Sequence, residues 1–149
     1  MLKQLLKDKK ALVIIICCII GFALIRNYEA VLFYDPFLDY FKNDYLNLPF
    51  PEFNTPSLIW NLLLRYLLNS FLSLLILYFM FKDIELIKFL SVLYLILLVL
   101  LIVSFYFIVE ILNENYNFLL FYVRRFLIQP LFLIIFIPAF YIQKSTKTT

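Results

Sequence analysis

The sequence predicts an all-α protein, an integral membrane four-helix bundle with a short amphipathic helix at the outer interface. Hydrophobic residues make up 65% of the 149 residues, and the mean hydropathy is +0.97. A soluble domain is only about half apolar, so lipid must solvate much of this surface. Four apolar runs with short connections use the whole chain, which predicts a single transmembrane domain over residues 1–149.

The first span is expected over about residues 11–34. Lysine-rich residues come before an uninterrupted apolar run at 11–25, and no small-residue cleavage site follows. This pattern indicates an uncleaved signal anchor. Because the apolar run alone falls short of a hydrocarbon core ~30 Å thick, the helix is expected to continue past Arg26 and stop before Pro36.

A polar segment at residues 35–56 separates the first span from the second. The apolar residues Phe37, Phe41, Tyr45 and Leu48 recur in it at helical spacing, which predicts a short helix lying in the outer interface. The remaining three spans are expected over about 57–81, 86–109 and 118–142, with Pro130 and Pro138 interrupting the last.

The lysine distribution predicts the orientation of the chain. The N-terminus, the turn at 82–88 and the C-terminal tail hold eight lysines, whereas the two opposite loops hold only Lys42. Cytoplasmic loops carry the excess of basic residues in membrane proteins. Both termini are therefore expected in the cytoplasm.

All four arginines lie in or beside the predicted spans, and counting from the span ends places them in the outer portion of the bilayer. They are Arg26, Arg65, Arg124 and Arg125. An arginine near the centre of a membrane-spanning helix raises the free energy of insertion by roughly 2.5–3.5 kcal/mol, so the presence of these four calls for an explanation. Arg65 belongs to a stripe repeating every four residues, which puts Asn61, Arg65, Asn69 and Ser73 on one helix face. Gln129 follows Arg125 at the same spacing.

Two hypotheses account for these polar residues. In the first, the arginines pair with acidic residues at the outer rim, namely Glu29, Asp35, Glu110 and Glu114, and the amides bond across helices. In the second, spans two and four form a cationic cleft for an anionic lipid headgroup, a polyprenyl phosphate or a carboxylate of another protein. The candidate contact residues are Arg65, Arg124, Arg125, Asn61, Asn69, Gln129 and Arg26.

Composition argues against an enzyme. With no histidine and one glycine, the chain lacks histidine-dependent acid–base or zinc chemistry and glycine-rich phosphate loops. Cys17 and Cys18 are predicted in the cytoplasmic half, far from the arginines. We therefore expect no catalytic, cofactor or metal site. The net charge of +3, without a basic patch outside the spans, also argues against nucleic-acid binding.

Several segments resemble the exosortase F system-associated membrane proteins of Bacteroidetes-type bacteria. The segments are YDPF at 34–37, DYF at 39–41, LLRYLLNS at 63–70, FYVRRFLIQP at 121–130 and PAFY at 138–141. The resemblance spans essentially the whole chain. It implies a location in the bacterial inner membrane and association with an exosortase, a membrane transpeptidase that processes sorting tails of exported proteins.

The leading hypothesis is a non-catalytic accessory subunit of an exosortase-type sorting system, contacting its partner through the arginines and amides. The resemblance assigns no catalytic residue, and this chain lacks the histidine that an exosortase uses. A second hypothesis is a binder or carrier of an anionic lipid-linked substrate. A third is a purely structural scaffold, in which the arginines only hold the helices together. Membrane lipids are expected neighbours in every case.

Overall fold

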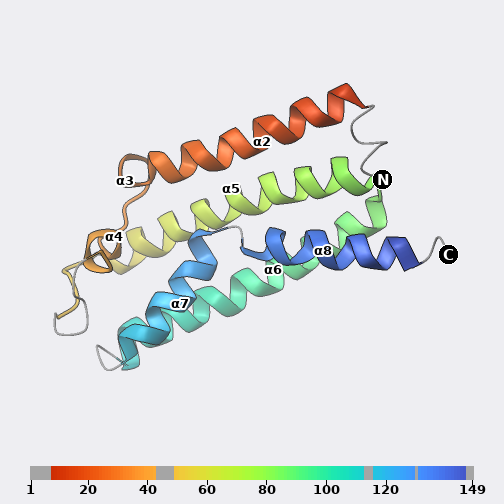
Figure 1. Ribbon diagram of the computed structural model, residues 1–149. Coiled ribbons are helices and arrows are strands. Elements are labelled where there is room, and N and C mark those ends of the chain that lie inside the picture. Colours follow the sequence, from red (N-terminus) through yellow and green to blue (C-terminus); the bar gives the residue numbers. More distant parts are fainter. Residues whose placement is uncertain (1–7, 43–48, 113–115, 130, 147–149) are drawn as a thin grey trace.

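The three longest helices run back and forth roughly along one direction of the molecule (Figure 1). The computed structural model describes residues 8–42, 49–112, 116–129 and 131–146. Within these ranges every regular element is helical and none is a strand, as the sequence predicts. Three helices are long and apolar enough to cross a membrane, and a bent pair near the C-terminus makes up to four. These features suggest a membrane protein.

The first long helix, α2 (Lys9–Asn27), is shorter than expected. Asp8 caps its start, and the Asp8 side chain accepts a hydrogen bond from the backbone N–H of Ala11. The helix ends at Asn27, and after a turn the four-residue helix α3 (Glu29–Leu32) follows. The expected single helix to residue 34 is therefore interrupted. The turn accompanies an inward orientation of the buried Glu29 side chain, whose carboxylate binds Arg65 on another helix.

Among the described residues, the expected interfacial helix corresponds to one turn, α4 (Phe37–Tyr40). Its apolar face packs inside the protein rather than facing lipid, because Phe37 and Tyr40 are both buried. The ring of Phe37 lies 6.2 Å from that of Phe105 and contacts three further phenylalanine rings. Aromatic partners within the fold thus replace the predicted membrane contact. Tyr45 and Leu48, the other residues of that pattern, lie outside the described residues.

The helices α5 (Thr55–Phe81) and α6 (Ile84–Phe107) agree closely with the second and third predicted spans. Lys82 and Asp83 form the turn between them: Lys82 has a left-handed backbone at φ 50°, and the Asp83 side chain caps α6. Lys82 Nζ also lies 2.6 Å from a carboxylate oxygen of Asp8. This hydrogen bond lowers the pKa of Asp8. The start of α2 and the α5–α6 turn therefore meet at one end of the molecule, where α8 also ends (Figure 1).

After a π-helical turn at Ile108–Leu112, the predicted fourth span is two helices rather than one. They are α7 (Asn117–Ile128) and α8 (Leu131–Thr146), bent by 65° where they meet. Gln129 has an extended backbone, which is what a following proline imposes on the residue before it. Pro130 itself lies outside the described residues. The sequence predicts an interruption in this span, and the structure shows a bend of 65° between its two helices, which can still form one broken span.

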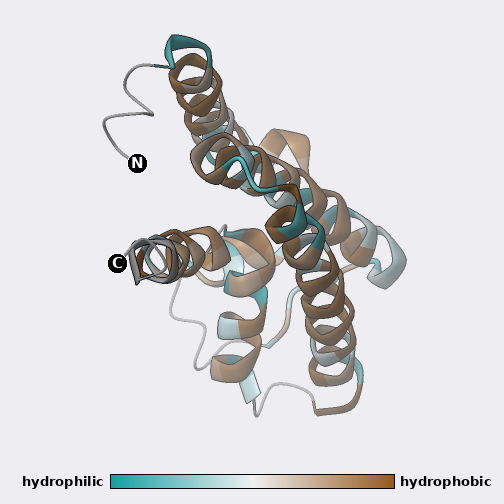
Figure 2. Cartoon of the chain, turned by 90° about the vertical axis from the view of Figure 1, so that its right-hand side faces the viewer, coloured by the Kyte–Doolittle hydropathy of each residue, from teal (hydrophilic) through white to brown (hydrophobic). Residues whose placement is uncertain are grey.

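Apolar side chains cover the outside of the long helices. Figure 2 shows brown, hydrophobic residues along most of the helix shafts, with hydrophilic residues gathered mainly at helix ends and turns. On α6, Val92, Leu95, Val99 and Val103 are all more than half exposed. An exposed apolar surface of this extent is typical of contact with lipid. The buried residues form two clusters, one around Phe37 and Leu62 and one around Leu77 and Leu90.

The glycine at position 21 allows α2 to approach α5 closely. A Cβ atom added at Gly21 would lie 3.2 Å from Leu72 Cδ1 on α5. The flexible end of Leu72 can yield to one methyl group, but not to a larger side chain. We expect Gly21→Leu to lower the free energy of unfolding by about 1–3 kcal/mol through overpacking, measured by thermal unfolding in detergent. The matched control is Cys17→Leu at an exposed position of α2; an equal loss in both variants would contradict the close approach.

Candidate functional site: an arginine–carboxylate cluster and the cavity beside it

Arg65 lies deep inside the protein. It follows Thr55 by ten residues, roughly 15 Å along the axis of α5, and its side chain is 1% exposed. Its Nη2 donates a hydrogen bond to Glu29 Oε2, and its Nη1 lies 3.7 Å from Asp35 Oδ2. The guanidinium also stacks on the ring of Phe33, 5.6 Å from the ring centre. Two carboxylates thus compensate the charge that the sequence places within this apolar helix.

Arg124 binds Asp35 through two hydrogen bonds. Its Nη2 lies 2.5 Å from Asp35 Oδ2 and its Nε 3.3 Å from Oδ1, which is the bidentate geometry that guanidinium groups favour. Asp35 therefore bridges α5 and α7, because it faces both Arg65 and Arg124. Glu29 is shared in the same way, since Arg26 Nη1 donates to it at 2.9 Å. We call these five residues the arginine–carboxylate cluster: Arg26, Glu29, Asp35, Arg65 and Arg124.

The cluster is not electrically balanced. Three guanidiniums face two carboxylates, which leaves one positive charge uncompensated among the described residues. An uncompensated charge in an apolar environment is costly. Arg26 relieves part of this cost, because its side chain is 59% exposed.

The first hypothesis is therefore confirmed for two of the three acidic residues that the structure describes. Glu29 and Asp35 pair with arginines as expected, but Glu110 instead accepts a hydrogen bond at 2.8 Å from the hydroxyl of Thr55. Glu110 lies in the π-helical turn after α6, next to the start of α5. Glu114 lies outside the described residues.

The adjacent arginines of α7 have opposite environments. Arg124 is buried in the cluster, whereas Arg125 is exposed. Neighbouring residues on an α-helix differ in direction by about 100°, so only one of the two can face the core. Arg125 Nε instead donates to Gln129 Oε1 at 3.1 Å, in agreement with their predicted shared face.

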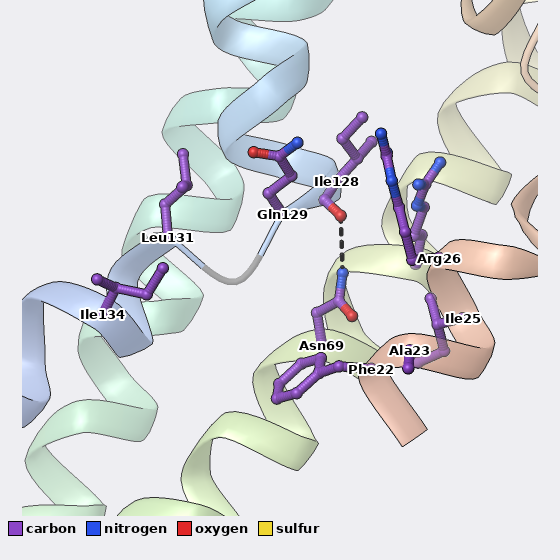
Figure 3. Close-up of a pocket in the computed structure, with 10 residues that line it drawn as sticks. Phe22, Ala23, Ile25, Arg26, Asn69, Ile128, Gln129, Leu131 and Ile134 are labelled. Carbon is purple, nitrogen blue, oxygen red and sulfur yellow. Dashed lines mark hydrogen bonds between the residues drawn. The ribbon is translucent and has the colours of Figure 1, made fainter. Parts of the chain in front are cut away.

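The polar stripe of α5 points inward over most of its length. Arg65, Asn69 and Ser73 are buried, and Asn61 is half-buried. Asn69 Nδ2 donates to the backbone carbonyl of Ile128 at 2.9 Å (Figure 3), which satisfies an acceptor at the last residue of α7. The expected bonding of amides across helices is thus seen at Asn69. Asn61 instead donates to the carbonyl of Ser57 within its own helix.

A cavity of about 320 Å³ lies beside the cluster, where α2, α5 and the α7–α8 junction meet (Figure 3). Its polar lining residues are Arg26, Arg65, Asn69 and Gln129, and its apolar ones are Phe22, Ala23, Ile25, Ile128, Leu131 and Ile134. Ligand sites in proteins begin at about this size. Four of the seven candidate contact residues thus share one cavity, whereas Arg124, Arg125 and Asn61 do not line it. The expected cleft lay between spans two and four, but α2 forms one wall as well.

Comparison with protein-family models, with curated proteins and with solved structures finds no match for this chain. The resemblance to the exosortase-associated family therefore stays a prediction.

Proposed function

We propose that this protein is a non-catalytic accessory subunit of an exosortase-type sorting system in a bacterial inner membrane. The observation that supports the proposal is the exposed Arg125. It lies on α7 beside the exposed apolar side chains of Phe118 and Tyr122, and no ion pair compensates it among the described residues. A cation on an apolar helix surface is costly in lipid, and an acidic group of a neighbouring subunit would remove that cost.

The proposed contact surface differs from the one that the sequence predicted. Arg65 and Arg124 are buried and paired with carboxylates of the same chain, so another protein subunit cannot reach them from outside. Arg125 with Gln129 forms the proposed surface. The third hypothesis, a structural scaffold, accounts for Arg65 and Arg124 but gives no role to Arg125.

The proposed orientation follows from the lysines. The start of α2, the α5–α6 turn and the end of α8 share one end of the molecule, and the lysine-rich segments lie there or continue from it (Figure 1). We assign this end to the cytoplasm on the positive-inside rule. The cluster then lies towards the opposite, outer face, where an exosortase meets exported proteins. Proteolysis of tagged termini in sealed vesicles would test this assignment.

Arg125→Leu is expected to reduce recovery of the exosortase in a pull-down at least about tenfold, because the partner's acidic group would lose its counter-charge. The measurement is affinity purification of the tagged protein in a mild detergent from its native membrane, with mass spectrometry of bound proteins. Since Arg125 is exposed, the variant should keep its thermal stability.

The matched control is Lys88→Leu, which removes an exposed cation near the start of α6. It should leave recovery unchanged. Absence of an exosortase from the wild-type pull-down would overturn the proposal, and equal recovery with Arg125→Leu would exclude this contact surface.

A further inference from the structure

We infer that the cavity beside the cluster binds the phosphate group of an anionic membrane lipid, whose chains lie outside it between α2 and α8. This site adjoins the proposed partner surface, because Gln129 belongs to both, but Arg125 itself does not line the cavity. It gives the second hypothesis, an anionic lipid-linked ligand, a definite location.

Charge is the first argument. The cluster carries one positive charge more than its carboxylates compensate, and two of its three arginines line the cavity. A phosphate group placed there would restore the balance. Basic pockets between membrane helices are known to take phospholipid headgroups for this reason.

Unused donors are the second argument. Arg65 is almost fully buried, yet its Nε and Nη1 have no hydrogen-bond partner among the described residues. Buried polar groups without a partner are uncommon and call for an explanation. Gln129 accepts from Arg125 with its oxygen, which leaves its NH₂ group to donate. A phosphate has several acceptor oxygens and suits guanidinium and amide donors together.

The size and lining of the cavity indicate which part of the lipid lies inside it. At about 320 Å³ the cavity suits a headgroup rather than a whole lipid. Its apolar lining continues outward, since Ile134 on α8 lines it and is 66% exposed. Leu24 on α2 and Ile135 on α8, each next in sequence to a residue that lines the cavity, are also exposed. An acyl or polyprenyl chain would thus leave the cavity along an apolar surface, which a soluble anion would not need.

The test is native mass spectrometry of the delipidated full chain in detergent, titrated separately with phosphatidylglycerol, a polyprenyl phosphate and zwitterionic phosphatidylcholine. We expect one molecule of an anionic lipid to bind at least about tenfold more tightly than phosphatidylcholine. Preference for phosphatidylglycerol or for the polyprenyl phosphate would support the site and identify the lipid class. Equal binding of all three lipids would overturn it.

Two variants locate the binding. Ala23→Leu fills the cavity without changing any charge, and we expect it to weaken anionic lipid binding about tenfold or more. Ala139→Leu is the matched control, an exposed alanine of α8 that does not line the cavity. Arg65→Leu removes the excess charge but leaves the pairs Arg26–Glu29 and Arg124–Asp35, so it should fold and lose the lipid preference. Equal affinities of Ala23→Leu and Ala139→Leu would place the lipid elsewhere and refute the inference.

Discussion

Asp35→Asn is expected to lower the free energy of unfolding by about 3–5 kcal/mol, the cost of breaking a buried ion pair from one side. Its carboxylate is 3% exposed and faces both Arg65 and Arg124. The amide would keep the shape of the side chain but remove its negative charge. Arg65 would then keep only Glu29, which it shares with Arg26, and Arg124 would lose the one carboxylate that it contacts among the described residues. We expect the variant to unfold at a clearly lower temperature in detergent, followed by circular dichroism.

Asp39→Asn is the control for this substitution. Asp39 lies four residues later, its side chain is 85% exposed, and it forms an ion pair with the exposed Lys42. Exposed pairs contribute little to stability, so the unfolding temperature should hardly change. Similar losses in the two variants would show that Asp35 does not compensate the buried arginines.

Glu29→Leu is expected to lower the free energy of unfolding by about as much as Asp35→Asn, and a second substitution should restore part of the lost stability. Alone it leaves Arg65 with only the 3.7 Å contact to Asp35, at a cost of about 3–5 kcal/mol. Adding Arg65→Leu removes the buried guanidinium that lost its carboxylate partner. The Arg124–Asp35 pair remains, and Arg26 is exposed enough to be solvated.

The double variant should therefore be more stable than Glu29→Leu by about 0.5–3 kcal/mol, the range of coupling energies between residues of one salt-bridge network. Arg65→Leu alone should cost less than Glu29→Leu, because each carboxylate keeps one arginine. A double variant no more stable than Glu29→Leu would contradict the pairing. A four-member thermal unfolding series in one detergent provides the measurement.

Periodicity along one helix was the part of the site that the sequence could predict. Arg65, Asn69 and Ser73 repeat every four residues, and all three are buried on one face of α5. The same spacing correctly joined Arg125 to Gln129. Such patterns depend only on helix geometry, which is the same in every protein.

Contacts between distant segments could not be predicted in the same way. The sequence contains four acidic residues that could pair with the arginines. Which of them do so depends on where the 28–37 segment turns and on how α7 is rotated about its axis. That rotation decides that Arg124 is buried and Arg125 is exposed. Similarly, Phe37 suits both a membrane interface and an aromatic cluster, and only the position of Phe105 on α6 decides between them.

The order of the charges along the chain has a consequence for biosynthesis. Glu29 comes 36 residues before Arg65, and Asp35 comes 89 residues before Arg124. Chains are made from the N-terminus, so both carboxylates have left the ribosome before either buried arginine follows. Each buried arginine is therefore synthesised after the carboxylate that pairs with it in the folded protein. In the reverse order, each arginine would be synthesised first and would have no paired carboxylate until the acidic residue followed.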